Sequence, residues 1–527
     1  MPTTLNTEKN TSAIQSIIGK KIAIESNTNY AFESLALIAK TYFESCGCKV
    51  IRFHRVLPSI KEIIKSKVSY HLPPHTKNSS NESVMPRLFD IVKWNIKSLV
   101  YSYYHFLVLS LHIKNIFELT IDGIEIGDQV VSDGARFRQK HITKSAMGLG
   151  LIKSLKDFYL SYSHTKYLIN THCVDVFMVS HLVYSWSMIS KVAITLNKGY
   201  LYLGKYPYSI LVTSEHSDPY HPKILSSFQK DKCSRNERKI AEKYMQERVT
   251  SGKKVLPHME VNAYSGSCEN FNHKYNNEKE IIHCCIFLHS FSDSLFNFGY
   301  DSFNNIWHWT EFTIERLTKN EKVKIFIKPH PNIAHKMKTG FASLKNDHQA
   351  FNLLKDKYEH LAAVEFLSPT TSNIDISSMN NFIGITHHGN VAPELAFLNK
   401  PIIASKHAPW KYFGDFLISW ENKDEYEVQL SNIEKYIDFV PNKSKLLDFA
   451  YKYYIKPVLI SDNKFYGNKL YEMIYNKDAK NLSETMQKSE EMLHIIRQDK
   501  NKLQEGLRIF DGMINQAIIN GRNASKS

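Results

Sequence analysis

Two short polar segments, each directly after an apolar run, carry residue types suited to binding an anion. The first is KVKIFIKPHPN (residues 322–332), in which Lys328 ends a predicted strand and two prolines fix the backbone around His330. An imidazole and a cation at a strand end can donate hydrogen bonds to a phosphate oxygen and assist a phosphate as it leaves. A plain loop histidine between two turn-forming prolines explains the pattern equally well.

The second segment is IGITHHGNVAPELAFLNKPIIAS (residues 383–405). A predicted strand ends at the histidine pair, Gly389 permits a close backbone turn, and the helix that follows offers free N–H groups to an anion. Glu394 in its first turn is placed to accept hydrogen bonds from ribose hydroxyls, or only to complement the helix dipole. Two such strand ends in neighbouring βα units predict a nucleotide site. Its predicted contacts are Lys328, His330, Pro331, His388, Gly389, Asn390 and Glu394.

Apolar runs alternate with helix-sized gaps in both halves of the chain, which is typical of parallel sheets. We therefore predict an α/β fold with two Rossmann-like parallel-sheet domains facing across a cleft, plus a C-terminal helical tail. The predicted strands are residues 21–25, 48–53, 166–170, 174–179, 191–195 and 200–203 in the first half, and 281–289, 323–328, 363–367, 381–386 and 401–405 in the second.

The predicted divisions are a flexible tail at 1–20, domains at 21–275 and 276–460, and a helical tail at 461–527. Apolar residues in the tail, from Leu482 to Ile514, recur in steps of three and four with polar interruptions at Ser489 and Lys500. This heptad pattern predicts either a coiled-coil homodimer or a docking helix.

One long apolar stretch, SLVYSYYHFLVLSLHI (Ser98–Ile113), is shorter than the roughly 20 residues that a bilayer span needs. It predicts a buried core helix, with interfacial membrane contact as the alternative.

The net charge indicates an anionic partner. The 527 residues include 67 Lys or Arg and 52 Asp or Glu, giving +15. A phosphorylated substrate, a membrane surface or a nucleic acid would each suit this charge. Nucleic acid is disfavoured because the basic residues are scattered and no nucleic-acid-binding module is recognisable.

The seven cysteines form no CxxC pair and no ligand spacing is regular, so we expect no metal or other cofactor. The polar N-terminal segment lacks the apolar stretch of a secretory signal, which predicts a cytoplasmic protein.

The two strand-end segments resemble the donor-binding half of GT-B glycosyltransferases of bacterial surface polysaccharide synthesis, namely capsule-type Kdo and sialic-acid transferases with a His-Pro motif. Residues 287–313 resemble the part of that family preceding the motif, and residues 126–138 and 174–202 resemble its acceptor domain. The resemblance covers roughly residues 120–410. It implies that the domain at 21–275 binds the acceptor and the domain at 276–460 binds the nucleotide sugar.

By position, the resemblance implies that His330 contacts the nucleotide phosphate and Glu394 the ribose. It also implies a catalytic carboxylate in the acceptor domain, either Asp128 or Asp133. The family's second aspartate would fall at Ser132, so the choice stays open; Asp133 is slightly favoured, although an Asp-Gly turn explains it too. Candidate contacts with the sugar or the acceptor are His289, Asp293 and His181.

The predicted function is sugar transfer from a nucleotide-activated donor, a CMP-sugar first and a UDP-sugar next, to a glycan or glycolipid acceptor in capsule or lipopolysaccharide synthesis. Peripheral contact with the cytoplasmic face of the inner membrane is also expected. The alternatives are a CDP-alditol phosphotransferase, a nucleotide-sugar 2-epimerase and a non-catalytic partner in capsule assembly.

Overall fold

The structure is a computed structural model. It describes residues 19–26, 39–41, 43–45, 47–55, 86–113, 115–137, 149–203, 210–212, 232–250, 263–264, 270–275, 277–291, 299–331, 342–413 and 416–455, and the single residues Ala36, Leu57 and Val84. Asp293, the tail up to residue 18, and the predicted helical tail with its heptads lie outside these ranges.

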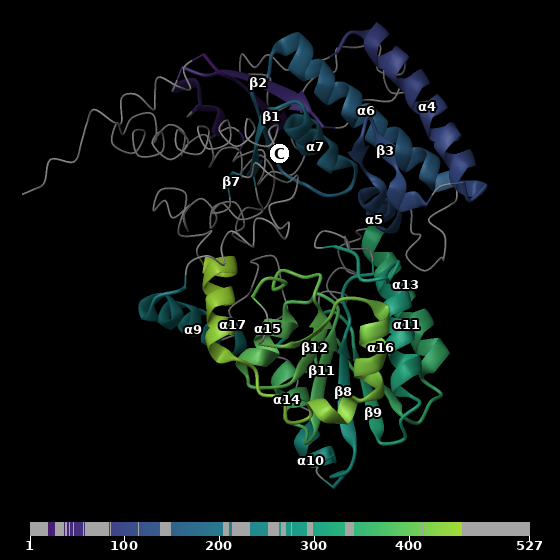
Figure 1. The fold of residues 1–527 in the computed structure, drawn as a ribbon, viewed down its shortest axis with the longest axis vertical. Helices are drawn as coiled ribbons and strands as arrows, with labels where there is room; N and C mark the ends of the chain where they lie inside the picture. Colours follow the sequence, from purple (N-terminus) through teal and green to yellow (C-terminus); the bar gives the residue numbers. More distant parts are fainter. Residues whose placement is uncertain are drawn as a thin grey trace, which may run out of the picture. The chain divides into compact units, whose positions relative to one another are not determined.

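The chain divides into two compact units (Figure 1). Unit 1 comprises residues 1–130, 147–224 and 457–527, and unit 2 comprises 131–146 and 225–456. The division falls within α5 (Gly127–Phe137). Residues 225–275 group with unit 2, whereas the sequence predicts a domain boundary at residue 275. The reason is α9 (Arg235–Thr250), whose Arg238 Nε donates to Asp448 Oδ1 of unit 2 at 2.7 Å.

Unit 1 is built on a five-stranded sheet with the order β2-β1-β5-β6-β7, in which only β7 runs antiparallel. The long helices α4 and α6 pack on each other, and α6 also contacts α7. The strands are β1 (Lys21–Ser26), β2 (Lys49–His54), β5 (Val176–Val179), β6 (Gly199–Leu203) and β7 (Ile210–Val212), with a small hairpin of β3 (Thr120–Ile121) and β4 (Ile124–Glu125); the helices are α4 (Leu88–Ser110), α6 (Leu149–His172) and α7 (Met188–Thr195), with 3-10 turns η2 (Ile116–Glu118) and η3 (Tyr184–Ser187).

Two predicted strands of the first half are wrong. Residues 166–170 lie in α6 and residues 191–195 in α7. Short apolar runs do not distinguish a strand from one turn of a buried helix. In α6 the buried Leu151, Leu155, Phe158 and Leu168 continue a helical spacing into the run, which decides for the helix.

The prediction of a buried core helix around residues 98–113 is also wrong in one respect. The helix forms, as α4, but large apolar side chains on its outer face are exposed. Within the described part of the chain, no helix combines the length and the apolar character that crossing a membrane requires.

Unit 2 is a six-stranded, all-parallel sheet with the order β10-β9-β8-β11-β12-β13. Every residue of β8, β11 and β12 is buried, as expected for strands covered on both faces. Helices flank the sheet: α11 packs with α16, and α15 packs with α9 and α17 (Figure 1). The strands are β8 (Ile282–Phe287), β9 (Val323–Lys328), β10 (Val364–Phe366), β11 (Phe382–Thr386), β12 (Ile402–Ser405) and β13 (Ile418–Trp420); the helices are α10 (Phe271–Tyr275), α11 (Ile306–Leu317), α13 (Ala342–Tyr358), α14 (Asn373–Ser377), α15 (Val391–Phe397), α16 (Lys423–Ser431) and α17 (Lys443–Ala450), with the turns η5 (Ile433–Tyr436) and η6 (Tyr451–Ile455).

Both units therefore have the parallel-sheet α/β architecture that the sequence predicts. The five strands predicted for the second half are all present as β8 to β12, and β13 is an addition that the sequence reading missed.

Candidate functional site

The carboxyl ends of β8 and β11 mark the point where the sheet of unit 2 reverses its direction of winding. The chain runs outward from β8 through β9 to β10, and then returns to β11 on the other side of β8. Ligands of doubly wound sheets bind beyond the carboxyl ends of the strands at such a switch point. The strand order thus selects this edge as the candidate site of unit 2.

Three histidines converge at the switch point because they occupy equivalent positions. His289, His330 and His388 each lie two residues beyond the end of their strand, β8, β9 and β11 respectively. The ring centroids of His289 and His388 are 4.0 Å apart, and those of His289 and His330 are 6.3 Å apart. The structure thus brings together two predicted contacts of the nucleotide site, His330 and His388, and His289, a candidate contact with the sugar or the acceptor.

The imidazole of His388 is held in its neutral form. Burial and the neighbouring rings of His289 and His387 keep its pKa well below the ordinary value. A neutral imidazole offers one N–H donor and one acceptor nitrogen, while a nearby anion favours the protonated ring. The cluster is therefore suited to respond to a bound negative charge.

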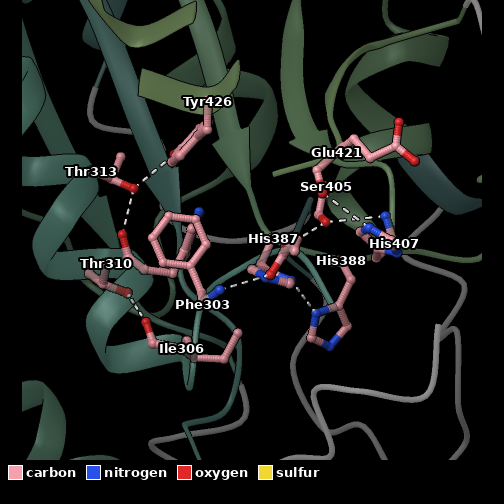
Figure 2. Close-up of polar contacts among 12 residues, drawn as sticks. Phe303, Ile306, Thr310, Thr313, His387, His388, Ser405, His407, Glu421 and Tyr426 are labelled. Carbon is pink, nitrogen blue, oxygen red and sulfur yellow. Dashed lines mark hydrogen bonds and ion pairs between the residues drawn. The ribbon is translucent and has the colours of Figure 1, made fainter. Parts of the chain in front are cut away.

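His387, the residue before His388, has a partner at each ring nitrogen. Its Nδ1 lies 2.9 Å from Nδ1 of His388, and its Nε2 lies 2.8 Å from Oδ2 of the buried Asp301. Ser405, at the end of β12, donates to the same Asp301 oxygen at 2.7 Å. Figure 2 shows His387 and His388 beside Ser405 and His407. Asp301 thus joins the ends of β11 and β12, a role that its position in a loop did not reveal.

The Asp301 carboxylate should stabilise the fold in a pH-dependent way. Burial raises its pKa, but His387 and the hydrogen bonds from His387 and Ser405 outweigh burial and lower the pKa from 3.8 to about 2. A lowered pKa contributes stability that is complete above pH 4 and is lost as the pH falls through 2; here it amounts to about 2 kcal/mol. We expect the difference in unfolding free energy between the wild type and Asp301→Asn to shrink by about that amount between pH 5 and 2, measured by urea denaturation.

Asp356→Asn is the matched control, since Asp356 lies exposed on α13. Its difference from the wild type should change much less over the same pH range. An equal pH response in both variants would contradict the role given to Asp301.

Lys328, the last residue of β9 and two residues before His330, is a buried cation. Its side chain is 2% exposed, and its Nζ donates to Oδ1 of Asn373 at the start of α14. Burial lowers its pKa from 10.5 to about 8, although Cys285 and Glu394 act in the opposite direction. Keeping a positive charge in such a place is unfavourable without an anion, which is typical of a binding site.

Both carboxylate oxygens of Glu394 accept hydrogen bonds from buried side chains. Its Oε1 accepts from Arg248 Nη2 at 2.5 Å and from Arg248 Nε at 3.1 Å, and its Oε2 accepts from the hydroxyl of Tyr264 at 2.7 Å. Tyr264 also interacts with Asn373, so a continuous buried network links Lys328 to Arg248. Glu394, the predicted ribose contact, thus has a structural role. Its side chain is only 7% exposed, so little of its carboxylate remains accessible to accept further hydrogen bonds.

Gly389 lies where a larger side chain does not fit. A Cβ at this position would come within 2.8 Å of Thr386 Oγ1, which donates to the carbonyl oxygen of Phe287 at 3.0 Å and so ties β11 to β8. Asn390 is exposed, and its Oδ1 accepts from the hydroxyl of Tyr454 at 3.0 Å. Pro331 lies at the end of the described segment that follows β9.

Unit 1 has its own polar cluster at the carboxyl ends of β1, β2 and β5. Glu25 is buried and accepts from the backbone N–H of Ser180 at 2.8 Å, and its Oε1 lies 3.0 Å from Arg55 Nη1. The same Arg55 nitrogen lies 3.3 Å from Nδ1 of His181, and the guanidinium stacks 3.8 Å above the ring of Trp186. Since β1 and β5 flank the switch point of this sheet, the cluster lies at the edge where doubly wound sheets generally bind ligands.

Of this cluster, sequence reasoning found only His181. Glu25 and Arg55 lie at the ends of two predicted strands. That position alone would have marked both as candidate site residues. Their pairing across 30 residues of chain needed the sheet order.

The two candidate catalytic carboxylates differ in exposure. Asp128 is about a third exposed and lies 3.7 Å from Lys191 Nζ. Its neighbour Gln129 accepts from the backbone N–H of Tyr184, which brings the first turn of α5 to the segment that follows β5. Asp133 is 1% exposed and belongs to the part of α5 that groups with unit 2.

Comparisons with known protein sequences identify no family for this chain. No protein-family model matches the sequence, and no curated protein matches it.

Among the residues that the structure describes, no group of three or more His, Cys, Asp or Glu side chains is arranged to hold a metal ion.

Solved structures with similar folds include the beta Kdo 2,4 transferase KpsC of Thermosulfurimonas dismutans, at 12% identity and a TM-score of 0.36, covering 53% of this chain and 79% of that one. The UDP-GlcNAc 2-epimerase of Methanocaldococcus jannaschii is 11% identical with a TM-score of 0.25 and coverages of 81% and 97%. A glycosyltransferase from Rickettsia africae is 10% identical with a TM-score of 0.25 and coverages of 92% and 100%. At these identities and TM-scores the likenesses carry no argument about the activity of this chain.

Proposed function

We propose that this protein is a GT-B glycosyltransferase that moves a sugar from a nucleotide-activated donor to a glycan or glycolipid acceptor in bacterial surface polysaccharide synthesis. A CMP-sugar is the first choice of donor and a UDP-sugar the second. The observation that carries the proposal is the convergence of His289, His330 and His388 at the switch point of unit 2, where β9 also ends in the buried Lys328. The resemblance of the two strand-end segments to capsule-type transferases supports the same function.

In this proposal the donor phosphate lies against the histidine cluster. His330 and His388 donate hydrogen bonds to phosphate oxygens, and Lys328 supplies a positive charge that burial makes more effective than it would be in water. As the bond between the anomeric carbon and the phosphate oxygen breaks, negative charge grows on that oxygen, and these groups stabilise it. The electrostatic contribution is therefore larger in the transition state than in the bound donor.

The acceptor binds at unit 1 in this proposal. Its hydroxyl loses a proton as the new bond to the anomeric carbon forms, and a carboxylate accepts that proton or attacks the anomeric carbon first. The greater exposure of Asp128 and its link to the segment after β5 favour it over Asp133. His181 and the ring of Trp186 lie at the same sheet edge and are candidate acceptor contacts.

A donor panel tests the proposal. CMP-, UDP- and GDP-sugars are titrated into the wild type, His330→Ala and His388→Ala, with binding followed by calorimetry and by the shift in melting temperature. One nucleotide sugar should stabilise the wild type, and each substitution should weaken its binding about tenfold, as expected for the loss of one hydrogen bond to a charged group.

His360→Ala is the matched control, because His360 is exposed in the turn directly after α13. It should bind the donor like the wild type. If no nucleotide sugar stabilises the wild type, or if both site variants bind as tightly as the control, the donor site is assigned wrongly. Conversion of a nucleotide sugar to its epimer without any acceptor would favour the epimerase alternative.

A further inference from the structure

The outer face of α4 carries a stripe of large apolar side chains. Phe89, Ile96, Val100, Tyr103 and Leu107 are between 54% and 76% exposed. They are spaced by seven, four, three and four residues, which places them on one face of the helix. A contiguous exposed face of this kind marks an interaction site in soluble proteins.

The middle of the opposite face of α4 is small and polar, between the buried apolar Ile91 near the start of the helix and Val108 and Leu109 near its end. Asn95, Ser98 and Ser102 are buried on the side where α4 packs on α6, and the two serine hydroxyls donate to backbone carbonyls of α4 itself. Small side chains permit close approach of two helices. Over its middle turns the helix therefore exposes large apolar side chains and buries small polar ones, which is the reverse of a typical surface helix. Figure 1 shows α6 beside α4, with α4 at the edge of the described part of unit 1.

The charges around the stripe select its partner. Lys93 lies within the stripe, four residues after Phe89, and Lys97 lies at its margin; both are exposed, and Asp90 is the one acidic residue of α4. A second copy of the chain would have to bury the Lys93 ammonium group in an apolar interface. At a bilayer surface the lysine stem can lie along the apolar region while the ammonium reaches the headgroups.

We propose that α4 is a membrane-docking helix, which lies flat on a bilayer of anionic phospholipid with the stripe in the interfacial region. Tyr103 and Tyr104 suit this position, because tyrosine has an apolar ring and a polar tip. The net charge of +15 favours the same surface. The inference does not depend on the donor site, and it is tested without any transfer assay.

Vesicle co-sedimentation tests the proposal with the full chain. The vesicles are phosphatidylethanolamine with phosphatidylglycerol, or phosphatidylcholine alone. The wild type should bind the anionic vesicles, and Val100→Glu/Leu107→Glu should reduce the partition coefficient at least tenfold. Lys93→Gln/Lys97→Gln should reduce binding to the anionic vesicles about fivefold for each lysine.

Val428→Glu/Val440→Glu is the matched control, since both valines are exposed in unit 2 and the change in charge is the same. It should bind vesicles more tightly than Val100→Glu/Leu107→Glu, because it leaves the stripe intact. Failure of the wild type to bind either vesicle, or equal binding by the two double-glutamate variants, overturns the proposal. A dimer in sedimentation velocity that only Val100→Glu/Leu107→Glu dissociates, without vesicle binding, would assign the face to a second copy instead.

Discussion

Replacing Arg248 with Met should lower the free energy of unfolding by about 3–5 kcal/mol, which is the usual effect of removing one partner of a buried ion pair. The side chains of Arg248 and Glu394 are 2% and 7% exposed. Burial alone would lower the pKa of Arg248, but Glu394 raises it above the ordinary value, so the guanidinium stays charged. Without it, the Glu394 carboxylate keeps only the Tyr264 hydroxyl as a neutral partner.

A double-mutant cycle separates this pair from its surroundings. Glu394→Gln retains an acceptor for Tyr264 while removing the charge, so adding it to Arg248→Met should recover part of the loss. We expect a coupling free energy of about 2–3 kcal/mol in urea denaturation followed by tryptophan fluorescence. Four of the six tryptophans lie in unit 2, at 307, 309, 410 and 420.

The partly exposed pair of Arg316 and Glu427, 2.9 Å apart, is the control. Arg316→Met should lower the unfolding free energy by less than about 1 kcal/mol, because water and salt screen a surface ion pair. If Arg248→Met is no more destabilising than Arg316→Met, the buried network does not hold α9 and α15 together. The same unfolding measurements show under which conditions Glu394→Gln is folded. Reduced donor binding by this variant indicates a ribose contact only under those conditions.

Lys328→Met should weaken donor binding about 100-fold, as expected for loss of a buried charged donor to phosphate. The same substitution should also remove an unfavourable buried charge from the unliganded protein. The folded-state pKa of Lys328 is about 8, below its ordinary 10.5. The protonated lysine therefore destabilises the fold at every pH below 8, and this effect disappears as the pH rises from 8 to 10.5.

We therefore expect the wild type to gain about 3 kcal/mol of stability relative to Lys328→Met between pH 8 and 10.5. Donor affinity of the wild type should fall over the same range, because the free lysine is then neutral. Denaturation and donor titration at pH 7, 8.5 and 10 measure both effects.

Lys324→Met provides the control on the same strand. Lys324 lies nearer the start of β9, is 24% exposed, and has Glu278 within 3.6 Å. Its replacement should leave donor affinity unchanged. A Lys328→Met variant that binds the donor like Lys324→Met would remove Lys328 from the phosphate site.

The strands of unit 2 and the location of its candidate site follow largely from the sequence. Continuous apolar runs such as Ile282–Phe287 form strands buried on both faces, and the polar residues that end them must meet because parallel strands share one carboxyl edge. This is why His330 and His388 could be placed together before the structure was known, and why His289 joins them.

Other features depended on contacts between distant residues. Arg248 and Glu394 are 146 residues apart, and Asp301 reaches Ser405 across 104 residues, so no local pattern marks either pair. Residues 166–170 and 191–195 have apolar runs short enough for a strand or a helix, and only their packing decides between the two.

The sequence by itself determined that the chain has two α/β sheets, and it determined which strand ends in unit 2 carry the histidines, because burial patterns and strand ends are local properties. Only the tertiary structure decided that Glu394 is anchored by Arg248, that Lys328 is a buried cation, and that α4 buries its serines while exposing Val100 and Leu107. The burial of a side chain depends on what packs against it, and for α4 that is the face of α6, which the spacing of residues along α4 does not specify.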